Sequence, residues 1–435
     1  MCGFAGLYLL DAAARPADLE ARVRAMARAI AHRGPDAESV LVEPFAAVGF
    51  RRLAIVDLVT GDQPVRAGDP RVQVFFNGEI YNHVELRDRL RHEHGVDVRG
   101  GSDAAVLPHL YERYGPDFVE LLNGMFAICV LDGRDGSCLL YRDRLGIKPL
   151  VFAERPGAVV FGSEPKALFA SGLVQAEVDA AALVPFLELF YVPGRRTMCR
   201  GVEKVLPGER VELRPGQPPR RVRWWRLADR VTPRPGDRLD ELDALLHEAT
   251  GLQLMADVPV GVSLSGGLDS SLIAHYANAG READAPPVRA FTIAFPDTDP
   301  GELACARAVC RALGIEQVEL SADADAFLDE LDATTWWNDD PVADPALFPA
   351  LCVARAAARH VKVLLAGSGA DELFAGYGHY RLTARGRAYR LLAHALGDRL
   401  AARAVGVRRP APERRTPTAR ADRKSTRLNS SHTDI

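Results

Sequence analysis

An alternation of apolar strands with helices between residues 238 and 366 constrains the fold more than any other feature of this sequence. Runs of strand length cover 258–264, 288–295, 317–320 and 361–366, and helical periodicity covers 239–254, 268–278, 302–313 and 346–359. Apolar strands joined through helices lie parallel and are covered on both faces. We therefore predict a doubly wound parallel sheet, which binds ligands beyond the carboxyl ends of its strands.

The residues before about 190 follow a different pattern, in which short apolar runs are broken by Gly, Asp and Pro. The runs at 72–76, 125–131, 138–142 and 158–161 indicate strands, whereas 19–30 and 104–114 have helical spacing. Sheets with helices packed outside them are expected here. The fold class is then α/β, with an α+β N-terminal part.

A stretch with five Pro and many Arg, from 214 to 238, separates the two patterns and is the natural domain boundary. It is either a linker or an exposed edge. The predicted division is a first domain at 2–213, the linker or edge at 214–237, a second domain at 238–400 and an unpatterned tail at 401–435. Residues 425–435 differ in composition from the rest, and a native tail and a cloning or assembly scar are equally compatible with them.

Composition excludes several classes of protein. The 435 residues carry 54 Lys plus Arg and 58 Asp plus Glu, a net charge of −4, which gives no overall attraction to nucleic acid or to an anionic membrane. No run approaches the ~18 apolar residues of a membrane helix, and no secretory signal is recognisable. The seven scattered cysteines show no disulfide-like spacing. A reducing cytoplasm is therefore the expected location.

Cys2 follows the initiator Met1 and precedes a glycine. If Met1 is removed, the thiol and the α-amine belong to one residue, and the amine, with a reference pKa of ~7.7–8.0, can act as the base for the thiol. The alternative is a small second residue that merely permits removal of Met1.

The side chains that could accompany this nucleophile come from three further segments. Asn77-Gly78 can supply an amide and an unobstructed N–H, the donors of an oxyanion hole. Arg52 can bind a carboxylate through two hydrogen bonds, and Glu79 and Asp103 can hold an ammonium or amide nitrogen. The alternatives are a hairpin turn at Asn77-Gly78 and surface ion pairs for the others.

These segments, together with RGPD at 33–36, RDRLGIKPL at 142–150 and FGSEPKAL at 161–168, resemble the class II glutamine amidotransferases and, within them, the glutamine-dependent asparagine synthetases. The resemblance implies an N-terminal αββα N-terminal-nucleophile (Ntn) hydrolase that releases ammonia from glutamine. It makes Cys2 the nucleophile, and Asn77 and Gly78 the oxyanion hole. The implied glutamine-binding residues are Arg52, Leu53, Ala54, Ile55, Val56, Asn77, Gly78, Glu79 and Asp103.

A glycine-rich loop joins a strand to a helix in the second domain, with the sequence SLSGGLDSS at 263–271. Turn glycines, serine hydroxyls and a helix N-terminus together favour phosphate. An acidic residue there, Asp269, would repel phosphate unless a cation such as Mg²⁺ lay between them. The alternative is a structural turn in which Asp and Ser cap the helix. The loop is neither a Walker loop nor a dinucleotide-binding fingerprint.

The same loop resembles the pyrophosphate loop of the ATP pyrophosphatases, which adenylate a carboxylate with ATP. The resemblance implies Mg²⁺ at Asp269 and Asp371. The implied ATP-binding residues are Leu264, Ser265, Gly266, Gly267, Leu268, Asp269, Ser270, Ser271, Ile293, Ala366 and Gly367. It also implies that the acidic segment at 336–345 lies near the acceptor site, although Trp336 and Trp337 are also compatible with the core.

Two departures from the family pattern limit the functional expectation. The family usually has Asp or Glu where this chain has Ser368, and relatives continue through a segment with an essential Lys, whereas the last lysine here is Lys424, in the tail. We expect a truncated synthetase domain. The leading hypothesis is a bifunctional enzyme that uses glutamine, aspartate and ATP to form asparagine, AMP and pyrophosphate. The alternatives are an amidotransferase for another carboxylate and a product with glutaminase activity or no activity. The family often dimerises, but no residue examined requires it.

Overall fold

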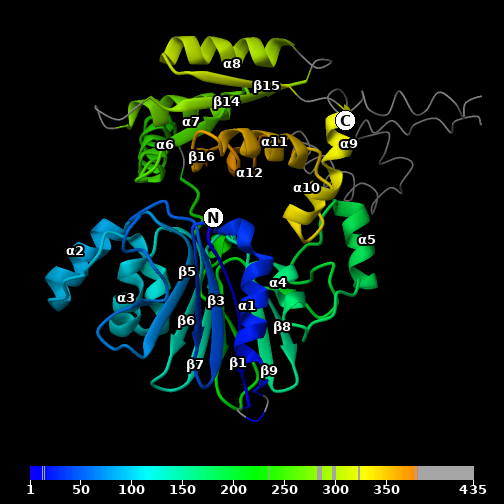
Figure 1. Ribbon diagram of the computed structural model, residues 1–435. Coiled ribbons are helices and arrows are strands. Elements are labelled where there is room, and N and C mark those ends of the chain that lie inside the picture. The colour runs from blue at the N-terminus through cyan, green and yellow to red at the C-terminus, as the bar shows by residue number, and fades with distance from the viewer. Residues whose placement is uncertain are drawn as a thin grey trace, which may run out of the picture. The chain divides into compact units, whose positions relative to one another are not determined.

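The computed structural model describes residues 1–11, 13, 15–234, 236–281, 287–295, 300–321, 324–377 and 380. The chain separates into two compact units, residues 1–366 and 367–435. The first unit contains two antiparallel six-stranded sheets, built from residues up to 223, and a four-stranded parallel sheet built from residues after 259 (Figure 1).

The two antiparallel sheets draw their strands from alternating segments of the chain. The first has the order β10-β8-β9-β1-β3-β2, with β1 (Gly3–Leu9), β2 (Ala37–Val42), β3 (Ala46–Arg52), β8 (Val151–Arg155), β9 (Ala158–Gly162) and β10 (Glu203–Lys204). The second has the order β12-β11-β7-β6-β5-β4, with β4 (Val65–Arg66), β5 (Val72–Ile80), β6 (Gly124–Asp132), β7 (Ser137–Arg142), β11 (Glu209–Leu213) and β12 (Arg220–Arg223). Strand β12 lies at the edge of its sheet, inside the segment predicted as a linker or edge.

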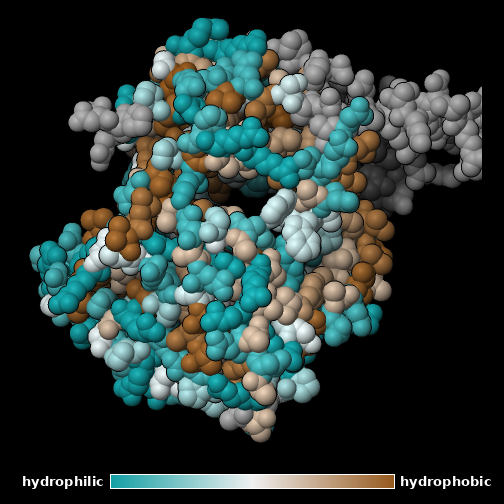
Figure 2. Space-filling model, in the orientation of Figure 1, coloured by the Kyte–Doolittle hydropathy of each residue, from teal (hydrophilic) through white to brown (hydrophobic). Residues whose placement is uncertain are grey.

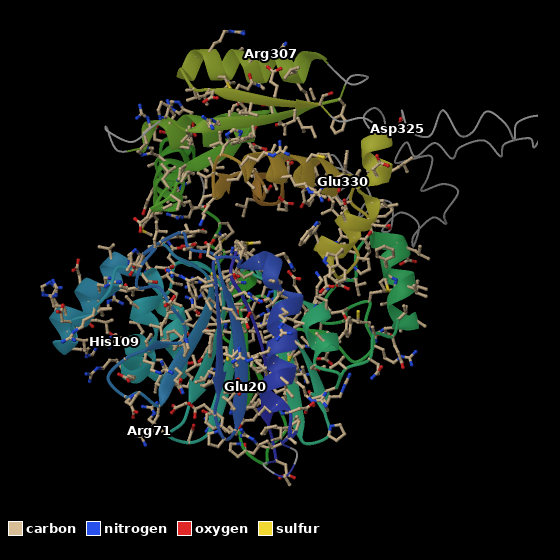
Figure 3. The ribbon with its side chains drawn as sticks, viewed as in Figure 1. Glu20, Arg71, His109, Arg307, Asp325 and Glu330 are labelled. Carbon is tan, nitrogen blue, oxygen red and sulfur yellow. The ribbon has the colours of Figure 1, made fainter. Side chains whose placement is uncertain are left out.

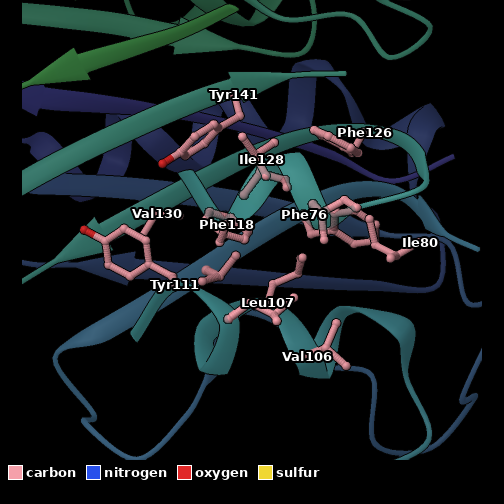
Figure 4. Packing of buried hydrophobic residues seen from close by; sticks show 14 of the residues in the cluster. Phe76, Ile80, Val106, Leu107, Tyr111, Phe118, Phe126, Ile128, Val130 and Tyr141 are labelled. Atoms are coloured by element: carbon pink, nitrogen blue, oxygen red, sulfur yellow. The ribbon is translucent and has the colours of Figure 1, made fainter. Parts of the chain in front are cut away.

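Three hydrophobic clusters hold these sheets in an αββα sandwich. One lies between the two sheets and includes Phe4, Phe75 and Phe161. Another packs the first sheet against α1 (Leu19–Ala29) and α4 (Pro165–Ala170). The third packs the second sheet against α2 (His83–His94), α3 (Val106–Tyr114) and η4 (Gly115–Leu121), as Figure 4 shows for Phe76, Leu107 and Phe118. The central strands of both sheets are therefore covered on both faces, as the predicted N-terminal fold requires.

The prediction of a hairpin turn as the alternative at Asn77-Gly78 is wrong. Strand β5 continues to Ile80 and pairs antiparallel with β6, so that Asn77 faces Ala127 and Gly78 faces Phe126. Most of β5 is buried because one of its faces meets the other sheet and the other meets helices. A strand of this kind shows little polar alternation, which is why its end could not be placed from the pattern.

The parallel sheet confirms the doubly wound arrangement. Its order is β15-β14-β13-β16, with β13 (Val260–Ser263), β14 (Arg289–Ala294), β15 (Gln317–Ser321) and β16 (Val363–Leu365). Helices α7 (Leu268–Ala279) and α8 (Pro300–Leu313) share one cluster with the sheet, and α11 (Leu347–Ala357) shares another. Helix α6 (Leu239–Gln253) packs on α7. Arg307 of α8, which Figure 3 labels, donates two hydrogen bonds to the carboxylate of Glu319 of β15.

The remaining elements are short. They are η2 (Ala31–Arg33), η3 (Asp103–Ala105), η5 (Leu227–Asp229), α5 (Ala180–Leu189), α9 (Ala324–Asp329), α10 (Leu331–Asn338) and, in the second unit, α12 (Ala370–Phe374). Helix α5 exposes Val184 and Leu187, and apolar colour marks its surface in Figure 2. Trp336 and Trp337 are 56% and 42% exposed, so the alternative that they belong to the core is wrong. In the described part of the chain, no helix combines the length and apolar character needed to span a bilayer.

Candidate functional site

Cys2 lies at the start of β1, where the first sheet brings it beside the end of β3. The register pairs Gly3 with Arg51, which places Leu53 next to Cys2. The Leu53 N–H donates to Cys2 Sγ at 3.3 Å, and the thiol lies 3.5 Å from the Leu53 carbonyl oxygen. Burial raises the pKa of the Cys2 thiol, while the Leu53 hydrogen bond lowers it. A nucleophile at this position needs a base, because it is not a thiolate by itself.

The Asn77 side chain provides unused hydrogen-bonding groups inside the sandwich, next to Gly78. Asn77 is fully buried, and neither its Oδ1 nor its Nδ2 has a partner among the described residues. Such orphan groups are rare, because each costs about 1–3 kcal/mol. Only glycine fits at position 78, since a Cβ there would lie 2.1 Å from the Met125 carbonyl oxygen. The arrangement suits an oxygen atom of a ligand that accepts from Asn77.

Glu79 and Asp103 form a carboxylate pair next to these residues. The Ile80 N–H donates to Asp103 Oδ2 at 2.8 Å, which brings η3 against the end of β5. Burial raises the pKa of both carboxyl groups, and the charge of Asp103 raises that of Glu79 further. Both carboxylates act on the Cys2 thiol by raising its pKa. A pair of buried carboxylates favours a cationic ligand group such as an α-ammonium.

Arg52, at the end of β3, is buried under the loop formed by residues 57–62. Its guanidinium donates to the Asp57 carbonyl oxygen and to Asp62 Oδ1. Asp57 fastens this loop to the Gly101-Ser102 segment by accepting from both backbone N–H groups, at 2.9 and 3.1 Å. Burial tends to raise the pKa of Asp57, but hydrogen bonds from Thr60 and Gly101 outweigh it and lower the pKa to about 2. The loop at 57–62 therefore contacts both Arg52 and the Gly101-Ser102 segment that precedes Asp103.

The other predicted glutamine-binding residues, Leu53, Ala54, Ile55 and Val56, follow β3 directly. Their backbone is held at several points, because the Ala54 N–H donates to Asp36 Oδ2 at 2.9 Å and the Ile55 oxygen accepts from Asp257 N. The structure thus brings the predicted glutaminase residues to one end of the sandwich. Their roles stay predictions.

Three further charged residues, Arg33, Lys148 and Glu164, lie around Cys2, and the sequence pattern predicted no role for them. Arg33 Nε donates to the Cys2 carbonyl oxygen at 2.9 Å, and its Nη1 donates to Glu164 at 2.7 Å. Lys148 is 3% exposed; burial lowers the pKa of its ammonium, and the charges of Glu79 and Cys2 counteract this effect. Arg33 lies in RGPD, Lys148 in RDRLGIKPL and Glu164 in FGSEPKAL. Their place in segments that carried the resemblance was the signal that the sequence offered.

The glycine-rich loop connects β13 to α7 as predicted. Its serines bond within the loop: Ser265 Oγ and Ser270 Oγ lie 3.0 Å apart, and Ser271 Oγ donates to the Gly267 oxygen at 2.7 Å. Gly266 has a φ of +88°, and a Cβ there would lie 2.4 Å from the Glu302 oxygen of α8. Gly266 is therefore required by the packing of α8, whereas a Cβ on Gly267 would meet only Ser265 Oγ.

Asp269 stands in the first turn of α7, at the helix N-terminus where an anion is favoured. No hydrogen bond or ion pair to its carboxylate comes from the residues that the structure describes. An unpaired carboxylate beside serine hydroxyls fits the oxygen ligands that Mg²⁺ prefers. No group of three or more potential metal ligands was found among the described residues.

The other predicted ATP-binding residues divide between the units. Leu264 is buried and donates its N–H to the Phe291 oxygen at 2.9 Å, which sets it beside the strand carrying Ile293. Ala366 ends the first unit. Gly367 and Asp371 belong to the second, where Asp371 lies in the first turn of α12. A common Mg²⁺ for Asp269 and Asp371 stays a prediction.

The acidic segment at 336–345 binds lysines of the N-terminal part. Asp339 Oδ2 accepts the backbone N–H of Lys166 at 2.9 Å, and Asp340 Oδ2 lies 2.8 Å from Lys204 Nζ. Lys166 Nζ also donates to the Trp336 carbonyl oxygen at 2.7 Å. These carboxylates have structural partners. A role at the acceptor site is not tested by these contacts.

Comparison with known families matches both parts of the chain. Residues 1–225 match the family described as glutamine amidotransferase domain, and residues 241–434 match the family described as asparagine synthase. The chain is 35% identical over 375 residues to "Asparagine synthetase [glutamine-hydrolyzing] 1" of Bacillus subtilis, covering 86% of this chain and 58% of the relative.

Two other matches differ in name. "Amidase chyE" of Penicillium rubens is 32% identical over 364 residues, which cover 79% of this chain and 53% of the relative. Among solved structures, the phosphoribosylpyrophosphate amidotransferase from B. subtilis complexed with ADP and GMP aligns with a TM-score of 0.38 and 16% identity. That alignment covers 73% of this chain and 65% of the other. The chain thus spans little more than half the length of the two curated relatives described here.

Proposed function

Since this chain belongs to the family in which a glutamine amidotransferase domain precedes an asparagine synthase domain, we propose that it acts as a glutamine-hydrolysing asparagine synthase. Glutamine hydrolysis at Cys2 supplies ammonia, and ATP activates the carboxylate that receives it. The observation that carries the first half is the buried Asn77 side chain, which lacks a partner at both polar atoms.

The proposed hydrolysis begins after removal of Met1, when the Cys2 amine takes the thiol proton. The thiolate then attacks the glutamine carboxamide carbon. Asn77 Nδ2 and the Gly78 N–H stabilise the oxyanion, as the unpartnered amide allows. The amine returns the proton to the leaving nitrogen, so ammonia departs and a thioester remains. Water hydrolyses the thioester to glutamate.

Substrate recognition uses the charged groups around this centre. Arg52 would bind the glutamine carboxylate, and Glu79 with Asp103 would hold its α-ammonium. In the present conformation the Arg52 guanidinium is engaged by Asp57 and Asp62. Binding through Arg52 therefore uses its remaining donors or displaces the Asp62 contact, in which the carboxylate is 81% exposed.

At the glycine-rich loop, we propose that the α7 N-terminus and the serines bind the phosphates of ATP. Mg²⁺ held by Asp269 and Asp371 would offset the charge of the pyrophosphate that leaves. Aspartate attacks the α-phosphorus through its side-chain carboxylate, which gives aspartyl-AMP and pyrophosphate. Ammonia then displaces AMP and yields asparagine. Leu264, Ile293, Ala366 and Gly367 would contact the adenosine.

The glutaminase half is tested with Cys2→Ala. Chain from which Met1 has been removed should release glutamate and ammonia from glutamine, and Cys2→Ala or retained Met1 should abolish this. Cys199→Ala is the matched control, because Cys199 is also half-buried but lies outside the site. Full activity in Cys2→Ala would refute the assignment of the nucleophile.

The synthetase half is tested with Asp269→Asn, measured as release of pyrophosphate from ATP in the presence of Mg²⁺ and aspartate. The variant should lose this activity and keep glutamine hydrolysis. Glutamate release without any ATP-dependent pyrophosphate in the unaltered chain would instead favour a glutaminase alone.

The second candidate function is amidation of a carboxylate other than aspartate. Ser368 favours this function, because Ser368 replaces the acidic residue typical of asparagine synthetases. A relative that is 32% identical is named an amidase. Pyrophosphate release stimulated by another carboxylate but not by aspartate would support this candidate.

A further inference from the structure

Lys148 is a buried cation that forms no ion pair with a carboxylate of the described residues. Its side chain is 3% exposed, yet the one hydrogen bond that the described residues give its ammonium is to the thioether of Met1, at 3.0 Å. A thioether is a weak acceptor. In a chain whose Met1 has been removed, even this contact is gone, and the ammonium faces the site of Cys2.

The backbone around Lys148 is fixed from two sides. The Lys148 N–H donates to Asp143 Oδ2 at 2.9 Å, and Asp143 also accepts from the N–H groups of Leu145 and Ile147. The Lys148 carbonyl oxygen accepts from Arg142 Nε at 2.9 Å. Such a loop holds the first atoms of the lysine side chain in place and directs them inward.

The charged and titratable groups around Lys148 come from several elements. They are Glu79 and Tyr81 of β5 and its end, Asp103 of η3, Arg33 of η2, Asp143 of its own loop, Cys2 and the terminal amine. Arg33 is paired with Glu164 at 2.7 Å, which offsets its charge. Lys148 has no such pair in the part of the chain that the structure describes, so its positive charge is not offset by a bound carboxylate there.

We propose that Lys148 is a positioning residue for glutamine hydrolysis, whose positive charge favours the ionised form of Glu79 and the neutral form of the freed Cys2 amine. The inference rests on the proposed glutaminase function. Burial and the charge of Asp103 raise the pKa of Glu79 to about 8, and without Lys148 it would rise further, so that the protonated Glu79 would bind the glutamine ammonium poorly. A protonated amine could not accept the thiol proton. The charge of Lys148 thereby favours both glutamine binding by Glu79 and uptake of the thiol proton by the Cys2 amine.

The electrostatic behaviour of the groups is consistent with this role. Burial lowers the pKa of Lys148 to about 8, and the Glu79 carboxylate counteracts this effect. Lys148 therefore carries its charge at and below neutral pH. Burial lowers the pKa of the Met1 amine, and the charge of Lys148 lowers it further; the same charge counteracts the burial that raises the pKa of Glu79. Loss of the charge should raise the pKa of both groups and so displace activity to higher pH.

The test compares Lys148→Met with Lys148→Arg in chain lacking Met1, as verified by mass spectrometry. In Lys148→Met, the acidic limb of kcat/KM for glutamine hydrolysis should move up by about one pH unit, within the range for one nearby charge. The KM for glutamine should rise at neutral pH and recover at alkaline pH. Lys148→Arg, which keeps the charge, should hold the acidic limb in place.

The outcomes separate this proposal from the glutaminase assignment. Absence of hydrolysis in the unaltered chain would contradict the assignment, whereas an active chain whose Lys148→Met variant loses the same factor at every pH would overturn only the role of Lys148. If Lys148→Met does not fold, NMR can instead follow the titration of Lys148 in the unaltered chain. The Lys148 signal is identified there as the lysine side-chain signal that Lys148→Arg lacks. A Lys148 that becomes neutral below the midpoint of the acidic limb would also refute the proposal.

Discussion

Replacement of Asn77 by Leu should separate stability from activity in the N-terminal sandwich. Asn77 is fully buried, and its two polar side-chain atoms lack partners among the described residues. Leu has a similar size and removes the unsatisfied groups, whose burial costs about 1–3 kcal/mol. The free energy of unfolding should therefore increase by roughly that amount. Since 1 kcal/mol corresponds to ~2–4 °C for a domain of 150–250 residues, Tm should rise by several degrees.

The same change should reduce hydrolysis of glutamine. Loss of one oxyanion donor typically costs a factor of ~10²–10³ in kcat, and glutamate release measures it directly. Glutamine should also raise the Tm of the unaltered chain more than that of Asn77→Leu, because only the former has an amide for the bound carboxamide oxygen.

Asn82→Leu is the matched control, with the opposite expected sign. Asn82 Nδ2 donates to the Leu121 oxygen at 3.0 Å, and its Oδ1 accepts from Asn123 N at 2.8 Å. Leu at this position breaks two hydrogen bonds and leaves their partners behind, so Tm should fall. If Asn77→Leu lowers Tm as Asn82→Leu does, and kcat stays within threefold of the original, the reasoning from unsatisfied buried groups is wrong.

Two further predictions concern the same end of the sandwich. Gly78→Ala should lower Tm and abolish glutamate release, because its Cβ would lie 2.1 Å from the Met125 oxygen, whereas Gly68→Ala, with its nearest contact at 3.5 Å, should leave Tm nearly unchanged; equal Tm values would contradict the clash. For Asp57, whose pKa is lowered to about 2, the stabilisation is complete above its unfolded pKa of ~3.9 and is lost as the pH falls toward 2. Thermal unfolding at several pH values should therefore show Asp57→Asn below the unaltered chain at pH 6 and converging with it near pH 2, and a constant gap would argue against ionisation as the cause.

Much of the fold followed from local pattern. The second domain was predictable strand by strand, because a parallel sheet covered by helices leaves continuous apolar runs of distinct length. In the N-terminal part the antiparallel strands at 124–132 and 137–142 were also predictable, because they are buried along most of their length and form continuous apolar runs. The end of β5 was not, since Asn77-Gly78 is a common turn pair and only pairing with β6 shows that the strand continues.

The candidate site divides in the same way. The residue types at Cys2, Arg52, Asn77, Gly78, Glu79 and Asp103, with the family resemblance that they carry, predicted glutamine hydrolysis from the sequence alone. The packing role of Gly266 was not predicted, because its positive φ and its close approach to α8 depend on contacts between elements. Arg33 and Lys148 lay in motifs that were noted, but no pattern in the chain revealed that their charges meet at Cys2.

The sequence by itself determined the class of chemistry, since a terminal cysteine, an Asn-Gly pair and a glycine-rich acidic loop each limit what their neighbourhood can do. Only the tertiary structure decided how the charges act on one another. Burial and distance set whether a carboxylate or an amine is ionised, and neither can be read from spacing along a chain. The alternation of strands and helices predicted the parallel sheet and the edge at which a nucleotide would bind. The amide of Asn77 and the ammonium of Lys148, which lack polar partners among the described residues, could be recognised only from the packing of the folded chain around them.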